Sequence, residues 1–343
     1  MKRVNYYDQL KIFSVIAVIL FHTSVEYYNF NAHGWVSAIA YSSFTRFCVP
    51  IFFMISGATL IEKSDSIGEF FKKRYSKIIP PLVFWSLIYS FVLSKINGSD
   101  FNIMKSLGEM ITTPVYIHFW FIYAIAGLYL LIPLLMQIRE EQKLTICKYY
   151  TCIWILFASI LPYARAIGIS IPEYIGTPYM FNEMYQFLNY SGYLTLGFVL
   201  ARTDLPIKNA IIKYSISSFA LSMILFSLVI HDSLSKEKIS QDLWGFKTPV
   251  VIALSTLVFL LFKSTSNLAF EKFKPTSSKL VNFVFSVYLV HYLYIFLIVR
   301  YFGYVFYPLP VILKIPIETS AITIMSFLTI FIMSKIPLVN RCI

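Results

Sequence analysis

Apolar runs of about 20 residues, separated by short polar connections, dominate the chain. A helix of that length spans the hydrocarbon core of a bilayer. The pattern predicts ten spans, near residues 9–28, 44–61, 78–95, 118–136, 147–162, 186–201, 210–230, 248–263, 282–301 and 311–333. We therefore expect an all-α, polytopic membrane protein that forms one transmembrane domain over residues 1–343, without an appended soluble domain.

Composition supports a membrane protein. The chain has 58% hydrophobic and 13% charged residues, whereas soluble chains carry about 25% charge. The net charge of +12 would suggest a nucleic-acid partner only in a soluble chain. In a membrane protein, Lys and Arg collect in cytoplasmic loops, and they are more than twice as frequent in the connections on the side of the N terminus. This asymmetry predicts cytoplasmic N and C termini, a multi-pass location in the cell (inner) membrane, and no nucleic-acid partner.

The first span carries the most informative polar residues. Between Ile12 and Phe21 only Ser14 is polar, and then His22 follows. Lys11 and His22 are about 16 Å apart along a helix and differ by roughly 20° in direction. Asp8 falls near the same stripe. An ionisable side chain within a span is by default a functional hypothesis, although polar residues can also serve only to pack a helix into its bundle.

Other polar residues lie where lipid or a membrane surface is expected. Arg46 belongs to the second span, where Pro50 and Gly57 loosen the helix and allow close approach. Arg46 either holds an oxyanion or a carboxylate of a substrate or extends its side chain to the membrane interface. Residues 72–77 carry four cations, which either clamp phosphates or anchor a cytoplasmic loop.

Aromatic and histidine residues mark the fourth and ninth spans. The fourth begins with His118 and Trp120, and aromatic residues at that place are normal for a membrane interface. The ninth contains Tyr288 and His291, and this second buried histidine is either a packing residue or a catalytic one. The four cysteines have no metal-site spacing, so we expect no metal.

Together these motifs resemble the membrane acyltransferase 3 family, in the same order and over nearly the whole chain. The similarity is strongest to its short members, of the kind that O-acetylate enterobacterial common antigen and lack a fused esterase-like domain. It depends on the following residues: Asp8, Lys11, His22, Arg46, 49–57, Arg74, Lys77, Pro80, 118–121, Tyr129, Pro133, Gly192, Tyr193, Gly197 and 286–291. Two positions differ from the family pattern, because Lys11 and Lys77 stand where arginine is usual, which keeps the charge but loses the planar guanidinium.

The resemblance implies an O-acyltransferase, most simply an O-acetyltransferase. It would move an acyl group from cytoplasmic acyl-CoA, with acetyl-CoA the expected donor, to a hydroxyl of a cell-surface polysaccharide such as O-antigen or exopolysaccharide, or of its lipid-linked precursor. The expected partners are the bilayer, the acyl-CoA, the glycan and polysaccharide-assembly proteins.

The predicted roles follow from that chemistry. His22 is the expected general base, because a neutral imidazole accepts protons near pH 7. The expected phosphate-binding residues for CoA are Lys11, Lys73, Arg74 and Lys77. Site-lining roles fall to Arg46 (a candidate oxyanion donor), Trp120, Asp8, Tyr288 and His291. Direct attack by the acceptor and a covalent acyl-histidine fit the residues equally well.

Two other classes of protein fit parts of the sequence. A polysaccharide exporter or transporter would also bury ionisable residues, but we find no repeated pair of broken spans of the kind common in transporters. A scaffold subunit of a polysaccharide synthase would not need the stripe from Lys11 to His22.

Overall fold

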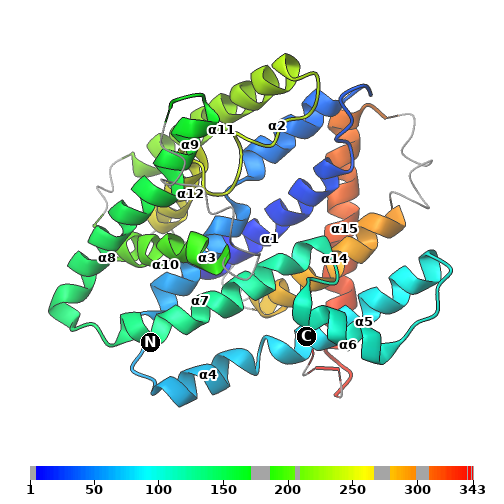
Figure 1. Cartoon of the computed structure of the whole chain (residues 1–343), viewed down its shortest axis with the longest axis horizontal. Helices are drawn as coiled ribbons and strands as arrows, with labels where there is room; N and C mark the ends of the chain where they lie inside the picture. Colours follow the sequence, from blue (N-terminus) through cyan, green and yellow to red (C-terminus); the bar gives the residue numbers. More distant parts are fainter. Residues whose placement is uncertain are drawn as a thin grey trace.

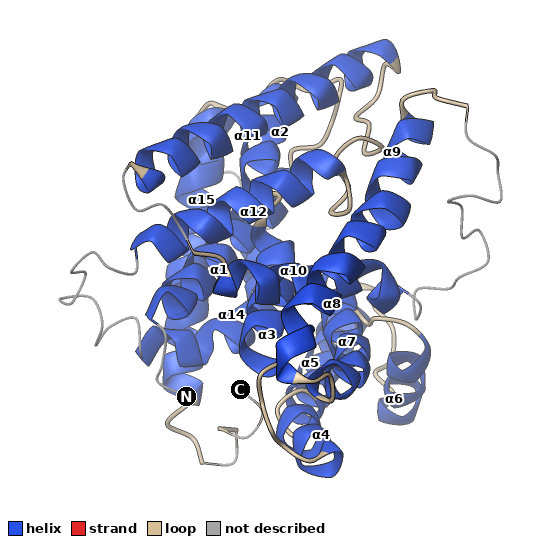
Figure 2. Cartoon of the chain, turned by 90° about the vertical axis from the view of Figure 1, so that its left-hand side faces the viewer, coloured by secondary structure: helices blue, strands red, loops and turns tan. Residues whose placement is uncertain are grey.

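The computed structural model describes residues 5–170, 186–204, 209–265, 279–298, 309–337, 339, 340 and 342. All regular structure in these ranges is helical, as predicted (Figure 2). The elements in chain order are α1 (Asn5–Val25), α2 (Trp35–Thr45), α3 (Cys48–Leu60), α4 (Ile67–Tyr75), α5 (Ile79–Ile96), α6 (Ile103–Thr112), η1 (Ile117–Phe119), α7 (Trp120–Met136), α8 (Glu140–Ile155), η2 (Leu156–Ile160), α9 (Leu161–Ala166), α10 (Gln186–Arg202), α11 (Ala210–Ser235), α12 (Pro249–Ser264), η6 (Val281–Phe283), α14 (Val284–Leu297) and α15 (Val311–Met333).

Seven helical segments in the described residues are long and apolar enough to cross a membrane: Asn5–Val25, Trp35–Leu60, Ile67–Ile96, Ile117–Met136, Glu140–Ala166, Ala210–Ser235 and Val311–Met333. Pro249–Ser264 and Val281–Leu297 are shorter apolar helices. Each of the ten predicted ranges overlaps one of these segments or α10, and the ninth range ends outside the described residues. The structure thus supports a multi-pass membrane protein, while the number ten and the cytoplasmic side stay predictions.

The segment that contains α2 and α3 is the buried centre of the bundle. In its apolar window 78% of the residues are buried, whereas in α11 the share is 17%. α1 contacts α2, α3, α14 and α15, and α3 packs along α10. Figure 1 shows α1 in the middle of the molecule, with α2 and α11 above it and α4, α5 and α6 below. Residues on α1 and α3 are therefore the ones that the fold holds inside.

Glycines on α3 and α10 allow these two helices to pack unusually closely. A Cβ atom on Gly57 would lie 1.9 Å from the backbone oxygen of Leu194, and one on Gly197 would lie 2.0 Å from the backbone oxygen of Met54. Neither position can accept a side chain unless the helices separate. The close approach predicted at Gly57 is confirmed, and Gly197 is its counterpart on α10.

Arg46 lies in a short break between α2 and α3. Pro50 explains the break, because a proline has no N–H to donate to the carbonyl four residues earlier, and its ring collides with that carbonyl. The regular pattern resumes at once, since the amide of Ile51 donates to the carbonyl oxygen of Phe47 at 3.2 Å. The break places a charged residue inside an otherwise apolar segment.

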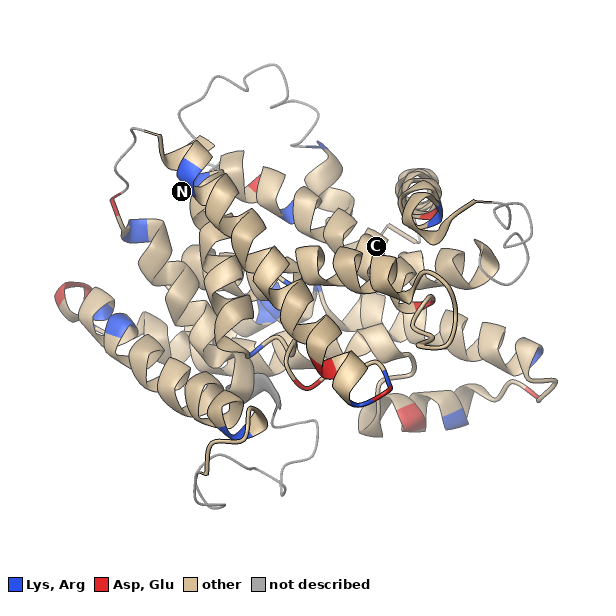
Figure 3. Ribbon diagram, turned by 90° about the horizontal axis from the view of Figure 1, so that it is seen from above, with Lys and Arg blue, Asp and Glu red and all other residues tan. Residues whose placement is uncertain are grey.

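Connections that were predicted to share one side of the membrane do meet in the structure. Arg202 forms an ion pair with Glu62 and another with Glu140, at 3.4 Å. The Lys263 amine donates to carbonyl oxygens at the C-terminal end of α10, including that of Thr203 at 2.6 Å. Cations there complement the negative end of the helix dipole. Figure 3 shows that most charged residues lie near helix ends and in connections.

Candidate functional site

The first part of the site is a cavity of about 620 Å³, which we call the Lys11 cavity. Its wall combines residues from six regions that are distant in sequence: Lys11, Phe52, Ile55, Ser56, Thr59, Leu60, Arg74, Ser76, Lys77, Ile78, Pro81, Phe121, Ile125, Tyr129, Asn282, Phe285, Ser286 and Asn340. Three of the four predicted phosphate-binding cations are in this wall, namely Lys11, Arg74 and Lys77. The fold therefore brings together cations that are up to 66 residues apart in the chain.

The fourth predicted cation, Lys73, is not part of that wall. Its amine pairs with Asp65 at 2.6 Å, and this hydrogen bond lowers the pKa of the Asp65 carboxyl. α4 begins with a capping box, in which Ser66 and Glu69 exchange hydrogen bonds. That cap fixes the direction in which α4 delivers Arg74 to the cavity.

The neighbourhood of Arg74 has a positive potential. The pKa of Lys63 is lowered, first by partial burial and then by the charges of Arg74, Lys73 and Lys77, which outweigh the opposite effect of Asp65. The Nε of Arg74 has no hydrogen-bond partner in the structure. Uncompensated donors and clustered cations are what a ligand with phosphate groups requires.

The second part of the site is a histidine cluster formed by His22, His118 and His291. The ring centroids of His22 and His291 are 5.4 Å apart, and those of His118 and His291 are 5.1 Å apart. Tyr292 contacts both His22, at 5.0 Å, and His118, at 5.2 Å. Three of the five histidines of the chain thus meet within the bundle.

Hydrogen bonds to backbone carbonyls set the tautomers of two of these rings. His118 Nε2 lies 3.2 Å from the carbonyl oxygen of Leu289, and His291 Nδ1 lies 2.6 Å from that of Tyr288. A carbonyl can only accept, so each of these nitrogens carries the proton. The opposite nitrogens, His118 Nδ1 and His291 Nε2, are buried and have no partner, which leaves their lone pairs available to accept a proton.

α14 connects the Lys11 cavity to the histidine cluster. Its first residues, with η6, contribute Asn282, Phe285 and Ser286 to the cavity, and its His291 contacts His22. Lys11 and His22 therefore both face α14, at two levels along α1. Tyr288 lies between these levels, because its ring contacts Phe121 of the cavity wall, at 5.2 Å, and its hydroxyl donates to the carbonyl oxygen of His118.

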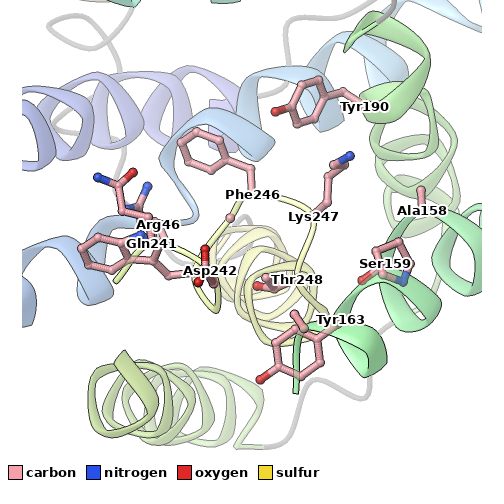
Figure 4. A pocket seen from close by; sticks show the side chains of 14 residues that line it. Arg46, Ala158, Ser159, Tyr163, Tyr190, Gln241, Asp242, Phe246, Lys247 and Thr248 are labelled. Atoms are coloured by element: carbon pink, nitrogen blue, oxygen red, sulfur yellow. The ribbon is translucent and has the colours of Figure 1, made fainter. Parts of the chain in front are cut away.

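A second cavity, which we call the Arg46 cavity, has a volume of about 380 Å³. Figure 4 shows its wall, which combines Arg46, residues of η2 and α9, Tyr190 of α10 and the connection between α11 and α12. The lining residues are Arg46, Ala158, Ser159, Pro162, Tyr163, Ala166, Tyr190, Gln241, Asp242, Trp244, Gly245, Phe246, Lys247 and Thr248. The two cavities share no lining residue, so they are separate sites.

Aromatic side chains separate the two cavities. Phe53 stacks on Tyr190, at 5.2 Å, on the side of the Arg46 cavity, and it contacts Phe121, at 5.1 Å, on the side of the Lys11 cavity. Trp120, a predicted site residue, contacts Tyr190 at 5.4 Å and stacks on Phe246 at 5.9 Å. Trp120 thus supports the wall of the Arg46 cavity from behind.

Asp8 belongs to neither cavity wall, whereas Arg46 is part of the wall of the Arg46 cavity. Asp8 is buried near the start of α1, and its predicted site-lining role stays a prediction. The guanidinium of Arg46 lies over the rings of Phe21, at 4.3 Å, and Trp244, at 4.1 Å. Its predicted role as an oxyanion donor also stays a prediction.

Sequence reasoning missed two members of the site. His118 was taken only as the start of an aromatic belt, although a histidine at the beginning of a span is itself an unusual signal. Lys247 was not singled out, because no local pattern in the sequence connects it to Arg46. Within the described residues, no group of three or more His, Cys, Asp or Glu side chains is arranged to hold a metal ion.

Comparison with known proteins identifies the family of the chain. No curated protein and no solved structure matches the chain significantly. The model of the acyltransferase 3 family, described as an acyltransferase domain, matches residues 4–335. Since the match covers nearly the whole chain, and since the apolar helices are those of a multi-pass membrane protein, the chain belongs to this family of membrane acyltransferases.

Proposed function

We propose that this membrane acyltransferase is an O-acetyltransferase of the cell (inner) membrane, which takes its acyl group from cytoplasmic acetyl-CoA and transfers it to a hydroxyl of a cell-surface polysaccharide or of its lipid-linked precursor. One observation carries the proposal. Lys11, Arg74 and Lys77 converge on one cavity, and α14 leads from that cavity to the histidine cluster.

The residues of the Lys11 cavity fit an acyl-CoA. Its cations match the phosphates, and the apolar side chains of Phe52, Ile55 and Ile125 suit the thin, uncharged arm that carries the thioester. The rise from Lys11 to His22 is about 16 Å, so an extended arm along α1 brings the thioester near the imidazole.

In this proposal the histidine cluster handles the proton. A neutral imidazole, which we assign to His22, takes the proton of the acceptor hydroxyl as its oxygen forms the new ester bond. The carbon–sulfur bond of the thioester breaks, and the proton is returned to the departing thiolate, so the products are the acylated glycan and free CoA. His291 contacts the ring of His22, and His118 contacts His291. Both have available lone pairs and are the alternative bases.

The direct test uses the purified full-length protein in lipid nanodiscs. It is incubated with acetyl-CoA labelled in the acetyl group and with envelope glycan of the source organism, and free CoA thiol and labelled glycan are both measured. We expect both to appear in equal amounts, with succinyl-CoA as a poorer donor. Glycan transport without any release of CoA would instead identify an exporter. If neither transport nor CoA release is observed, the scaffold subunit is the remaining interpretation.

A further inference from the structure

Arg46 is a buried cation that lacks an anionic partner. Only 6% of its surface is exposed, and it forms no ion pair with any residue in the described part of the chain. Its contacts with Phe21 and Trp244 offset part of the cost of burial. An unpaired buried charge still costs several kcal/mol, so the fold keeps Arg46 in a position where a bound anion would stabilise it.

A second cation shares the cavity. Lys247 belongs to the connection between α11 and α12 and lines the same wall as Arg46 (Figure 4). No hydrogen bond or ion pair joins its amine to another described residue, and burial lowers its pKa. Two cations from separate elements therefore face one space of about 380 Å³.

The polar atoms of the wall are biased toward donors. Arg46 Nε, Trp244 Nε1 and Thr248 Oγ1 are all buried without a hydrogen-bond partner, and the first two can only donate. Asp242 is the one carboxylate among the lining residues, and Lys236 already pairs with it at 2.8 Å. A ligand that fits this wall brings acceptor oxygens and negative charge.

Aromatic rings complete the wall. Tyr163, Tyr190, Trp244 and Phe246 surround the same space, and flat rings with polar edges suit the alternating apolar and hydroxyl faces of a sugar. The Arg46 cavity is separated from the cations of the Lys11 cavity by Phe53 and Phe121. It therefore lies on the acceptor side of the transfer.

We propose that the Arg46 cavity is an acceptor-binding site that recognises an anionic saccharide, in which Arg46 and Lys247 bind a phosphate or carboxylate group while the aromatic residues hold the sugar ring. This inference rests on the proposed function for the identification of the ligand as the acceptor. The inference that the ligand is an anion depends only on the unpaired cations.

Binding to the full-length protein in nanodiscs tests the proposal without any need for turnover. The probes are glucose 1-phosphate, glucuronate, neutral glucose and inorganic phosphate, and the readout is tryptophan fluorescence, since Trp244 forms part of the wall. Charge-assisted hydrogen bonds contribute about 1.5–3 kcal/mol, so we expect at least one charged sugar to bind more than about tenfold tighter than glucose. The charged sugar that binds more tightly shows whether the site prefers a phosphate or a carboxylate group.

Substitutions then assign the preference to the two cations. Arg46→Gln and Lys247→Gln should each remove most of the preference for charged sugars, whereas Lys238→Gln, an exposed lysine of the same connection, should leave it unchanged. If Arg46→Gln does not fold, Arg46→Lys, which keeps the charge but loses the guanidinium fork, should weaken binding of the charged sugar, and Lys247→Gln provides the second reading.

Each contrary outcome has a defined meaning. Equal binding of glucose and the charged sugars, or a preference that survives in both variants, overturns the anionic site. Inorganic phosphate that binds as tightly as glucose 1-phosphate overturns the part played by the aromatic residues. If the protein prefers charged sugars but releases no CoA from acetyl-CoA, the proposed function is contradicted and the anion site is not. If it releases CoA but shows no such preference, the anion site is contradicted and the proposed function is not.

Discussion

The two cavities place positive charge in opposite ways. In the Lys11 cavity the cations lie in the second turn of α1, in the last turn of α4 and in the connection after α4. Lys11 and Arg74 are partly exposed, and Lys77 is exposed. In the Arg46 cavity the guanidinium is buried at a helix break and lies against aromatic rings. Exposed cations cost little free energy when no ligand is bound, because water solvates them. A buried cation destabilises the fold until an anion binds to it. The first arrangement suits a ligand with several phosphate groups, and the second suits a ligand with a single negative charge in a fixed position.

The largest expected effect comes from the histidine cluster. His22→Ala should lower acyl transfer by about 10²- to 10⁴-fold, the usual contribution of a general base. Acetyl-CoA binding at the Lys11 cavity and binding of charged sugars at the Arg46 cavity should be retained, because neither wall includes His22. Initial rates of CoA release and the two dissociation constants measure this.

The neighbouring histidines provide the matched comparison for that variant. His118→Gln and His291→Gln remove the other two rings that have available lone pairs. If either substitution abolishes transfer while His22→Ala leaves it near the parent rate, the base is not His22.

The next effect should be confined to the donor cavity. Lys11→Ala and Arg74→Ala should each raise the KM for acetyl-CoA by roughly 10- to 100-fold, because each removes a charge-assisted contact with a phosphate. Lys335→Ala changes an exposed cation outside the wall and serves as the control. Steady-state kinetics with acetyl-CoA as the varied substrate measure the change.

The sequence prediction and the structure differ at Lys73. It was predicted to bind CoA, yet its amine pairs with Asp65 outside the cavity wall. We therefore expect Lys73→Ala to change the KM for acetyl-CoA much less than Lys11→Ala does. Equal effects of the two substitutions would favour the sequence prediction.

A smaller effect should reach both cavities at once. Gly57→Ala forces α3 and α10 apart, because the added methyl group would overlap the backbone of Leu194. Overpacking costs about 1–3 kcal/mol, so we expect a lower midpoint in thermal unfolding and weaker binding of both ligands. Gly68→Ala in α4, where no atom lies within 4 Å of the added carbon, is the control and should not destabilise the protein.

The smallest effect is a pH dependence specific to the Arg46 cavity. Burial lowers the pKa of Lys247, so its amine loses charge at a lower pH than an exposed lysine does. Affinity for a charged sugar should therefore fall a few-fold as pH rises through that lowered pKa, and the fall should be absent in Lys247→Gln. The other titratable groups of this wall are Arg46, Asp242, Tyr163 and Tyr190.

The sign of the effect on stability is the opposite. A buried amine with a lowered pKa disfavours the folded state while it is protonated, and this penalty fades as pH rises from the lowered pKa toward the ordinary value. Titration of charged-sugar binding and thermal unfolding over the same range of pH therefore distinguish a binding group from a purely structural one. An affinity that rises with pH would contradict the role of Lys247.

Periodicity and span length predicted the helical class, because lipid demands long apolar helices. Helix geometry also predicted that Lys11 and His22 share a face, since both belong to one rigid element. The meeting of His22 with His118 and His291 could not be predicted from spacing, because it depends on how α1, η1 and α14 pack. Arg46 was recognised as unusual, but its cavity is formed by Tyr163, Tyr190 and residues 241–248, which only tertiary structure brings to it.

Phe53 and Phe121 have a consequence for the membrane itself. In the proposed reaction the donor and the acceptor bind on opposite sides of these two rings, so the acyl group has to pass them while ions must not. Uncharged rings do not bind a hydrated ion, whereas a short acyl chain is apolar, as the rings are. We therefore expect the same two phenylalanines to block the passage of ions and to limit the size of the transferred acyl group.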